Sequence, residues 1–425
     1  MEMDENNHKG MPRFEQVAVV GLGYIGLPTA AIFASNGIKV LGVDVTPSVV
    51  ETVNAGGVHI EEGDLDTLVE RCVANGKLRA SLVPEQSDAF IIAVPTPVGH
   101  DEKHSPDVSY VQAAGRSIAP VLKRGDLVVL ESTSPVGTTE MLASLLAELR
   151  PDLVFPRQGK EQVDVNLAYC PERIIPGQML RELVENDRII GGMTPACTER
   201  AIALYQTFVK GVCHASDDKT AEMVKLTENA FRDVNIAFAN ELSMICDDLD
   251  IDVWGVINFA NRHPRVSILN PGPGVGGHCI AVDPWFIVDS APERSRLIRT
   301  AREVNDGKPL FVIDKVRKAL GGAVPKRIVC LGLSYKPDVD DFRESPSLEI
   351  ARDLNREFEG KVVWCDPFIK ALPESIASEC AQRTSSIAEA LDGADVVVML
   401  VGHSAFRSTP KPVDAKLVDT VGYWL

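Results

Sequence analysis

The chain has 425 residues, of which 45% are hydrophobic and 24% charged, so it is long enough for two or three globular domains. Its formal net charge of -17 argues against binding to nucleic acids or anionic membranes, and it has no apolar run of about 18 residues that would predict a membrane span. The nine cysteines include no C-x-x-C pair, which favours a reduced cytoplasmic protein without a metal cluster or a disulfide framework.

Patterns along the chain predict a tail and three regions. Residues 1–13 are polar and lack an apolar core, so we predict a disordered tail rather than a signal peptide. Over 14–210, apolar runs rich in Val and Ile alternate with helical patterns, as in a doubly wound parallel sheet. A central helical region is expected over 211–310. Strand patterns resume near Lys326 and predict a second α/β domain over 311–425.

The central region contains two contrasting stretches. From Thr220 to Leu249 there is neither Pro nor Gly, which predicts one long helix. From Asn258 to Asp283 the chain is dense in both, which predicts a loop. The predicted fold class is therefore α/β, with two Rossmann-like doubly wound domains joined by a long central helix.

A glycine-rich turn follows the first strand. Gly21, Gly23 and Gly26 form G-x-G-x-x-G between a strand and a helix, where the backbone can approach a pyrophosphate at the helix N-terminus. Asp44 ends the next strand, where a carboxylate can bind the ribose diol and repel a 2′-phosphate. The pattern predicts an NAD site. The alternative is a glycine turn in an α/β domain that binds no nucleotide.

Two threonines follow later strands of the same domain. Thr96 and Thr133 lie at the expected carboxyl ends of their strands, where open α/β sheets bind ligands. Each could instead be a turn-forming residue that caps the next segment.

A cysteine lies in an unusual loop, GPGVGGHCIAVDPWF, which runs from Gly272 to Phe286. Glycines there let the backbone approach a ligand, so Cys279 is a candidate nucleophile with His278 and Asp283 as proton handlers. With a hydride acceptor, a thiol can carry an alcohol to an acid through a thiohemiacetal and a thioester. The alternative is an inert loop cysteine.

A polar face is expected on the long helix. Lys225, Asn229 and Arg232 are spaced at i, i+4 and i+7, which places them on one side. Such a face could bind an oxyanion or a phosphate, or it could simply be solvated.

Seven motifs resemble one known family, the UDP-glucose/GDP-mannose dehydrogenases, over about residues 14 to 425. The motifs are VGLGYIGLPTA, ESTSPVGTTE, YCPERIIPG, AEMVKLTENAFRDVNIAFANEL, NRHPRV, GPGVGGHCIAVDPWF and SYKPDVDDFRESP. The cysteine loop and NRHPRV are most similar to members that oxidise UDP-N-acetyl-D-mannosamine at C6, which supplies a uronic acid for bacterial surface polysaccharides. The resemblance implies that activity, with NAD as cofactor.

The resemblance also implies a role for each matching catalytic residue. Cys279 matches the family's thiol nucleophile, and Lys225 matches a lysine that stabilises an oxyanion and helps proton transfer. Asn229 matches the residue that holds the reacting oxygen, and Asp283 matches an aspartate that supports water or the lysine. Glu172 matches a glutamate tied to thioester hydrolysis, although its flanking residues differ in UDP-glucose dehydrogenases.

Binding residues and an assembly follow from the same resemblance. The first domain would hold NAD, the last domain would hold UDP, and the central helices would build a homodimer in which the NRHPRV pair could reach a partner's site. The expected cofactor contacts are Gly21, Gly23, Tyr24, Ile25, Gly26, Asp44, Thr96, Thr133 and Arg343, the last being near the cofactor or its cleft. The expected substrate contacts are Arg173, Ile174, Lys225, Asn229, Arg232, His263, Arg265, Gly276, Tyr335 and Lys336.

Three other functions remain open at the level of sequence. UDP-N-acetylglucosamine or another UDP-sugar could be the substrate of the same chemistry, because a change at C2 lies far from C6. A reductase or epimerase could use bound NAD without needing Cys279. A nucleotide-sugar sensor would bind its ligand and form no NADH.

Overall fold

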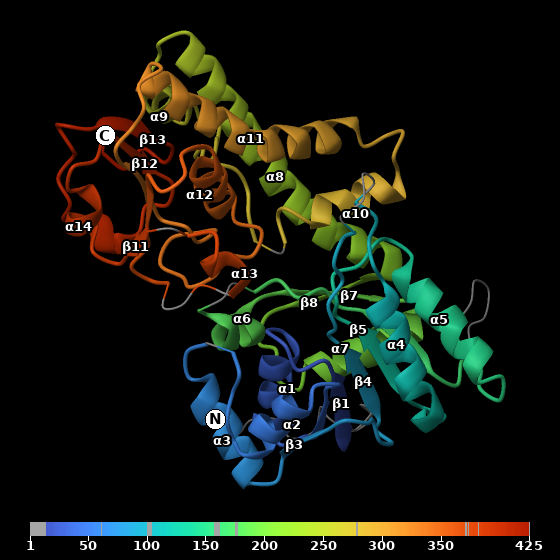
Figure 1. The fold of residues 1–425 in the computed structure, drawn as a ribbon. Helices are drawn as coiled ribbons and strands as arrows, with labels where there is room; N and C mark the ends of the chain where they lie inside the picture. The colour runs from blue at the N-terminus through green and yellow to red at the C-terminus, as the bar shows by residue number, and fades with distance from the viewer. Residues whose placement is uncertain are drawn as a thin grey trace, which may run out of the picture. The chain divides into compact units, whose positions relative to one another are not determined.

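The computed structural model describes residues 14–60, 62–99, 104–156, 162–174, 177–277, 279–369, 372, 374–380 and 382–424. The expected tail, residues 1–13, and His278 lie outside the described residues. The chain divides into two compact units, of which the first comprises Met1–Thr227 and Trp285–Ser290, and the second Glu228–Pro284 and Ala291–Leu425. Each unit contains one β-sheet (Figure 1).

The first sheet has eight strands among the described residues, in the order β3-β2-β1-β4-β5-β6-β7-β8. The first six follow the order of a dinucleotide-binding sheet. All neighbours are parallel except β6 and β7. The strands are β1 Gln16–Val20, β2 Lys39–Val43, β3 Leu78–Ser81, β4 Ala89–Ile92, β5 Leu127–Leu130, β6 Asn166–Tyr169, β7 Arg188–Gly192 and β8 Cys213–Asp217.

Helices cover both faces of this sheet, which explains why its central strands are almost continuously apolar. One face packs against α1 and α7, and the other against α4 and α5. The helical elements of the unit are α1 Gly26–Ser35, α2 Pro47–Asn54, α3 Leu65–Ala74, α4 Ser109–Ile118, η1 Ala119–Val121, α5 Thr138–Leu149, α6 Met179–Glu185 and α7 Pro195–Tyr205.

The expected long helix is confirmed as α8, Asp218–Asp248, which has 31 residues. The boundary between the two units falls within it. Three further helices follow: α9 Val253–Ala260, α10 Asp283–Ser290 and α11 Arg296–Leu320. The expected loop from Asn258 to Asp283 is therefore wrong at both ends. At its start, the Asp252 carboxylate caps α9 and lets that helix run to Ala260.

The second sheet is entirely parallel, with the order β11-β10-β9-β12-β13. Its strands are β9 Ile328–Leu331, β10 Val362–Cys365, β11 Gln382–Thr384, β12 Val396–Met399 and β13 Lys416–Asp419. Helices α11 and α12 (Pro346–Glu357) pack on one face and α14 (Ile387–Leu391) on the other. The shorter elements are α13 Glu374–Ala377 and η2 Ser404–Phe406.

This second order repeats that of the first five strands of the first sheet, so the predicted fold class of two Rossmann-like domains is confirmed. In the described part of the chain, no helix combines the length and apolar character needed to cross a membrane.

Candidate functional site

The glycine-rich turn has the geometry that a pyrophosphate site needs. Gly21 has a φ of 93°, and a Cβ added there would lie 2.5 Å from the Ala93 carbonyl oxygen. A Cβ at Gly26 would lie 1.7 Å from the Gly21 carbonyl oxygen. At Gly23, by contrast, a Cβ would meet no described heavy atom within 4 Å. Packing of the chain therefore requires the first and third glycines, whereas the second leaves open backbone in front of α1, where a phosphate can approach.

Asp44 lies directly beside this turn. Its Oδ2 accepts the backbone N–H of Leu22 at 3.0 Å, and its Oδ1 accepts that of Thr46 at 2.9 Å. The side chain is partly exposed at the carboxyl end of β2. A carboxylate has about four lone-pair sites, so the two amides leave acceptor capacity for a ribose diol.

We expect Asp44→Ala to weaken NAD binding by about tenfold or more and to relax discrimination against NADP, because a charged acceptor for the diol is lost. Titration of each dinucleotide against the variant measures both effects. Asp66→Ala, at an exposed position in the first turn of α3, is the matched control. An unchanged preference for NAD over NADP would show that the Asp44 carboxylate does not bind the ribose diol.

The two expected threonines are brought together. Thr96 Oγ1 donates to the Thr133 carbonyl oxygen at 2.5 Å, which ties the loop after β4 to the loop after β5. Sequence patterns missed another residue that holds the loop after β5, Glu222. Its carboxylate accepts the N–H groups of Gly137 and Thr139 at 2.6 and 2.8 Å, at the start of α5. Burial raises the pKa of Glu222 to about 7, against the opposing effect of these hydrogen bonds.

Glu172 and Lys225 also meet in the first unit. The Lys225 ammonium donates to the backbone carbonyl oxygen of Glu172 at 2.7 Å. The Glu172 carboxylate is buried and accepts the backbone N–H of Arg173 at 2.8 Å and a guanidinium N–H of Arg188 at 3.0 Å. Both oxygens of the expected hydrolytic glutamate are thus held by donors.

Arg188 belongs to a buried group that the sequence patterns did not reveal. Its guanidinium lies 3.9 Å from the carboxylate of Glu131, which also accepts the Tyr205 hydroxyl at 2.6 Å. Burial raises the pKa of Glu131 to about 7, with the charge of Glu172 adding to the effect and that of Arg188 opposing it. This buried group therefore holds Arg188 in position, and Arg188 in turn holds the Glu172 carboxylate.

The neighbours of Glu172 lie at the edge of this group. Arg173 donates to the carbonyl oxygen of Asp187 at 3.3 Å, and Ile174 packs against the core of the first unit. Tyr24 is 42% exposed and Ile25 is partly exposed next to the glycine turn. The sugar contacts of the first pair and the cofactor contacts of the second remain predictions.

The cysteine loop brings together three of the expected catalytic residues in the second unit. Cys279 is exposed, and its backbone carbonyl accepts the N–H groups of Val282 and Asp283 at 3.1 and 2.8 Å. The Asp283 carboxylate, at the start of α10, accepts the amide N–H of Asn229 at 2.5 Å. Because both partners are buried, this bond fixes the end of the cysteine loop to α8.

Tyr335 lies under the same loop. A Cβ at Gly276 would lie 2.4 Å from the Glu344 carbonyl oxygen, and a Cβ at Gly277 would lie 2.9 Å from the Tyr335 ring. The Gly277 N–H donates to the Arg343 carbonyl oxygen at 3.0 Å. These glycines therefore let the cysteine loop pack closely on the loop after β9.

The remaining expected contacts are on the surface of the second unit. Arg232, His263 and Arg265 are exposed, and the Lys336 ammonium lies 5.5 Å from the centre of the Tyr335 ring. The Arg343 guanidinium forms an ion pair with Asp341 at 2.6 Å. The roles of these residues toward substrate or cofactor stay predictions.

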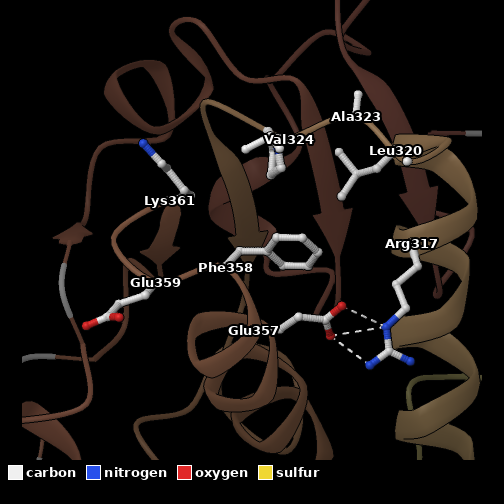
Figure 2. Close-up of a pocket in the computed structure, with 10 residues that line it drawn as sticks. Arg317, Leu320, Ala323, Val324, Glu357, Phe358, Glu359 and Lys361 are labelled. Atoms are coloured by element: carbon white, nitrogen blue, oxygen red, sulfur yellow. Dashed lines mark hydrogen bonds and ion pairs between the residues drawn. The ribbon is translucent and has the colours of Figure 1, made fainter.

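A pocket of about 530 Å³ lies elsewhere in the second unit (Figure 2). Leu320, Val324 and Phe358 form its apolar lining, and the ion pair of Arg317 with Glu357, at 2.7 Å, crosses its rim. Its residues precede β9 and β10, so it lies at the amino ends of these strands. Ligands of open α/β sheets bind at the opposite, carboxyl ends, so this pocket is separate from the candidate site.

Three domain models of one family match most of the chain. Residues 15–209 match the NAD binding domain of the UDP-glucose/GDP-mannose dehydrogenase family, residues 219–307 match its central domain, and residues 329–422 match its UDP binding domain. The predictions of an NAD-dependent enzyme and of this family are thereby confirmed.

Curated relatives extend over nearly the whole length. An NDP-N-acetyl-D-galactosaminuronic acid dehydrogenase from Ralstonia nicotianae is 57% identical, with 97% of this chain and 96% of the relative covered. A UDP-N-acetyl-D-mannosamine dehydrogenase from Yersinia pestis is 56% identical, with 97% and 99% covered.

A solved structure agrees in sequence and fold. The UDP-N-acetyl-mannosamine dehydrogenase from Staphylococcus aureus is 41% identical and superimposes with a TM-score of 0.83, with 96% of this chain and 95% of that chain covered. By these matches and by its two sheets, the chain belongs to the UDP-glucose/GDP-mannose dehydrogenase family.

Proposed function

We propose that this protein oxidises C6 of UDP-N-acetyl-D-mannosamine to a carboxylate in two NAD-dependent steps. The observation that carries the chemistry is the exposed Cys279, whose backbone carbonyl accepts the N–H of Asp283, the residue that is hydrogen-bonded to Asn229. The glycine turn with Asp44 supplies a dinucleotide site that fits NAD. The choice of sugar rests on relatives of 55–56% identity that carry that name.

Residues of the chain handle the proton, the thiol and the oxyanion. When bound, NAD takes the hydride from C6 in each oxidation. Lys225 assists removal of the hydroxyl proton in the first. The Cys279 thiolate then adds to the aldehyde, and Asn229 and Lys225 hold the oxygen of the thiohemiacetal. A nucleophilic, exposed thiol needs a reducing compartment, so we place the protein in the cytoplasm.

Hydrolysis completes the reaction. The second oxidation leaves a thioester between Cys279 and the sugar, and attack by water releases the acid and restores the thiol. We assign positioning of this water to Glu172 and Asp283. The hydrogen bonds from Arg188 and Arg173 fix the Glu172 carboxylate in place, which favours a positioning role over a large movement of that side chain.

A second candidate substrate is an N-acetylgalactosamine nucleotide. A relative named for the corresponding uronic acid is 57% identical over 413 residues, as similar as the mannosamine enzymes. The chemistry at C6 would be the same, and the pocket around C2 and C4 would decide between the sugars.

The test is the number of NADH molecules formed per sugar consumed, measured with UDP-N-acetylmannosamine, UDP-N-acetylgalactosamine, UDP-N-acetylglucosamine and UDP-glucose. We expect two per mannosamine sugar and little turnover of the others. If another sugar is turned over preferentially, the proposed substrate is wrong, but the proposed mechanism stands. One NADH per sugar would remove the thioester step, and none with any sugar would favour a sensor.

We infer that a second copy of the chain covers an apolar stripe on α8. Phe231, Phe238 and Ile245 are spaced by seven residues, so they lie on nearly one side of the helix, and they are 68%, 54% and 48% exposed. Leu297 and Leu310 on α11 are also largely exposed. Side chains of this size and regular spacing favour a helical dimer interface.

We expect Phe238→Glu to convert a dimer into a monomer, because a charge would be buried in an apolar contact. Sedimentation velocity measures the change. Val413→Glu is the matched control, since Val413 is 89% exposed in the same unit and outside the stripe. A wild-type monomer would contradict the inference.

A further inference from the structure

The turn after β9 reproduces, bond for bond, the glycine turn of the first unit. Gly332 has a φ of 83°, and its N–H donates to the Cys365 carbonyl at 2.8 Å, as that of Gly21 donates to the Val43 carbonyl at 2.8 Å. The next amide, that of Leu333, donates to Asp366 Oδ2 at 2.8 Å. Asp366 therefore occupies the position in the second sheet that Asp44 occupies in the first.

The two equivalent carboxylates have different surroundings. Asp44 is partly exposed, whereas Asp366 has no exposed surface. His403, from the loop after β12, covers it, with Nε2 lying 3.1 Å from Asp366 Oδ2. Burial favours a raised pKa for Asp366, but the hydrogen bonds from His403 and from backbone amides outweigh it and lower the pKa. An ionised carboxylate enclosed by donors cannot also bind a ribose.

The other nitrogen of His403 binds the loop that follows the turn. The backbone N–H of Asp338 donates to His403 Nδ1 at 3.0 Å. A backbone amide can only donate, so Nδ1 accepts this bond, and Nε2 is the ring nitrogen that faces the carboxylate of Asp366. The ring is thus a bridge between the loop and Asp366, and it is completely buried between Phe368 and Phe406.

Asp338 marks the far end of the loop that carries two expected substrate contacts, Tyr335 and Lys336. Asp338 has a φ of 63°, which is unusual for a residue with a side chain, and its Oδ1 accepts the N–H and hydroxyl of Ser404 at 2.8 and 3.0 Å. The near end is held by the bond between the Tyr335 N–H and the Asp341 carbonyl at 3.0 Å.

We propose that Asp366 and His403 are positioning residues: a carboxylate in the place of a ribose ligand anchors, through His403, the Tyr335–Asp338 loop that receives the UDP moiety of the substrate. The inference rests on the proposed function, because it takes this loop as a nucleotide contact. The anchor explains why the second sheet, which has the strand order and turn of a dinucleotide-binding sheet, would bind UDP instead of a dinucleotide.

Two isosteric variants of His403 separate this anchor from simple core packing. An Asn oxygen matches the position of Nδ1 and can still accept the Asp338 N–H, whereas a Gln amide matches Nε2 and can still donate to Asp366. Each variant keeps one of the two bonds of the ring. Calorimetric titration with UDP, and with NAD as an internal control, measures the consequence in the full-length protein.

We expect His403→Gln to weaken UDP binding by about tenfold and to raise the KM for the UDP-sugar more than it lowers kcat, since one hydrogen bond to the loop is lost. His403→Asn should keep UDP affinity within about threefold of wild type. NAD affinity should be unchanged in both. Thermal unfolding of the two variants shows whether they are equally folded, and Val398→Ala, in the core of the same sheet, is a control for lost stability alone.

Other outcomes would overturn the inference. Equal loss of UDP affinity in the Asn and Gln variants, or an equal loss in Val398→Ala, would reduce His403 to a core residue. Lys336→Ala distinguishes this failure from failure of the proposed function: if that variant binds UDP as wild type does, the loop is not the nucleotide contact. If it loses UDP while His403→Gln does not, only the anchoring role is wrong.

Discussion

Cys279→Ala should lower acid formation by roughly 10⁴-fold or more, because the second oxidation needs a covalent adduct with the aldehyde. The first hydride transfer forms no bond to sulfur, so the variant can release aldehyde and form at most one NADH per sugar. Trapping the aldehyde with hydroxylamine, while acid and NADH are quantified, measures both results.

The chain offers a matched control for this experiment. Cys380 is also in the second unit and is partly exposed, and its thiol donates to the Gln382 carbonyl at 3.4 Å. Cys380→Ala should therefore retain wild-type acid formation. Acid formation by Cys279→Ala at the wild-type rate would remove covalent capture from the mechanism.

Lys225→Ala should lower kcat by roughly 10²- to 10³-fold and change KM little, because an oxyanion is stabilised more strongly than the ground-state alcohol. The structure supports this role through the bond between the Lys225 ammonium and the Glu172 carbonyl. An ammonium group has three N–H donors, so the bond to the Glu172 carbonyl orients the Lys225 side chain and leaves other donors for a ligand. Steady-state kinetics with saturating NAD separates kcat from KM.

Lys219→Ala is the control for charge on the same helix. Lys219 is exposed and pairs with Glu140 at 2.8 Å, so its loss should leave both parameters near wild type. A mainly raised KM in Lys225→Ala, with kcat intact, would show that the lysine only holds the substrate.

The sequence predicted features that depend on local geometry. The glycine turn and Asp44 lie within a single strand–turn–helix–strand unit, so their spacing alone predicts where they meet. The same applies to Lys225 and Asn229, which are four residues apart on one helix. The loop containing Cys279 was predicted from its glycines. Two of them, Gly276 and Gly277, have no room for a side chain because Tyr335 and its neighbours pack against them.

Contacts between distant segments could not be predicted in this way. Arg188 meets Glu131 and Glu172 only because β5, β6 and β7 are neighbours, and β7 runs antiparallel to β6. Glu222 reaches the start of α5 across 83 residues of sequence. Neither Arg188 nor Glu222 belongs to a recognisable sequence motif. Whether a charged residue is buried depends on neighbours that come together only in the fold.

One missed residue did leave a readable signal. KVLGVD, which ends at Asp44, and KVVWCD, which ends at Asp366, share their first two residues and the final aspartate. VGLGY and LGLSY, each at the preceding strand, are also alike. Aligning the two halves would have predicted the second carboxylate, but not His403, which lies in the loop after β12.

Helix α8 carries two of the residues that we assign to the reaction, Lys225 and Asn229. The boundary between the two units falls between Thr227 and Glu228, inside a single helix, with Lys225 on one side of it and Asn229 on the other. One turn of helix keeps their Cβ atoms about 6 Å apart. The backbone positions of the two residues proposed to hold the reacting oxygen are therefore set by a single turn of α8.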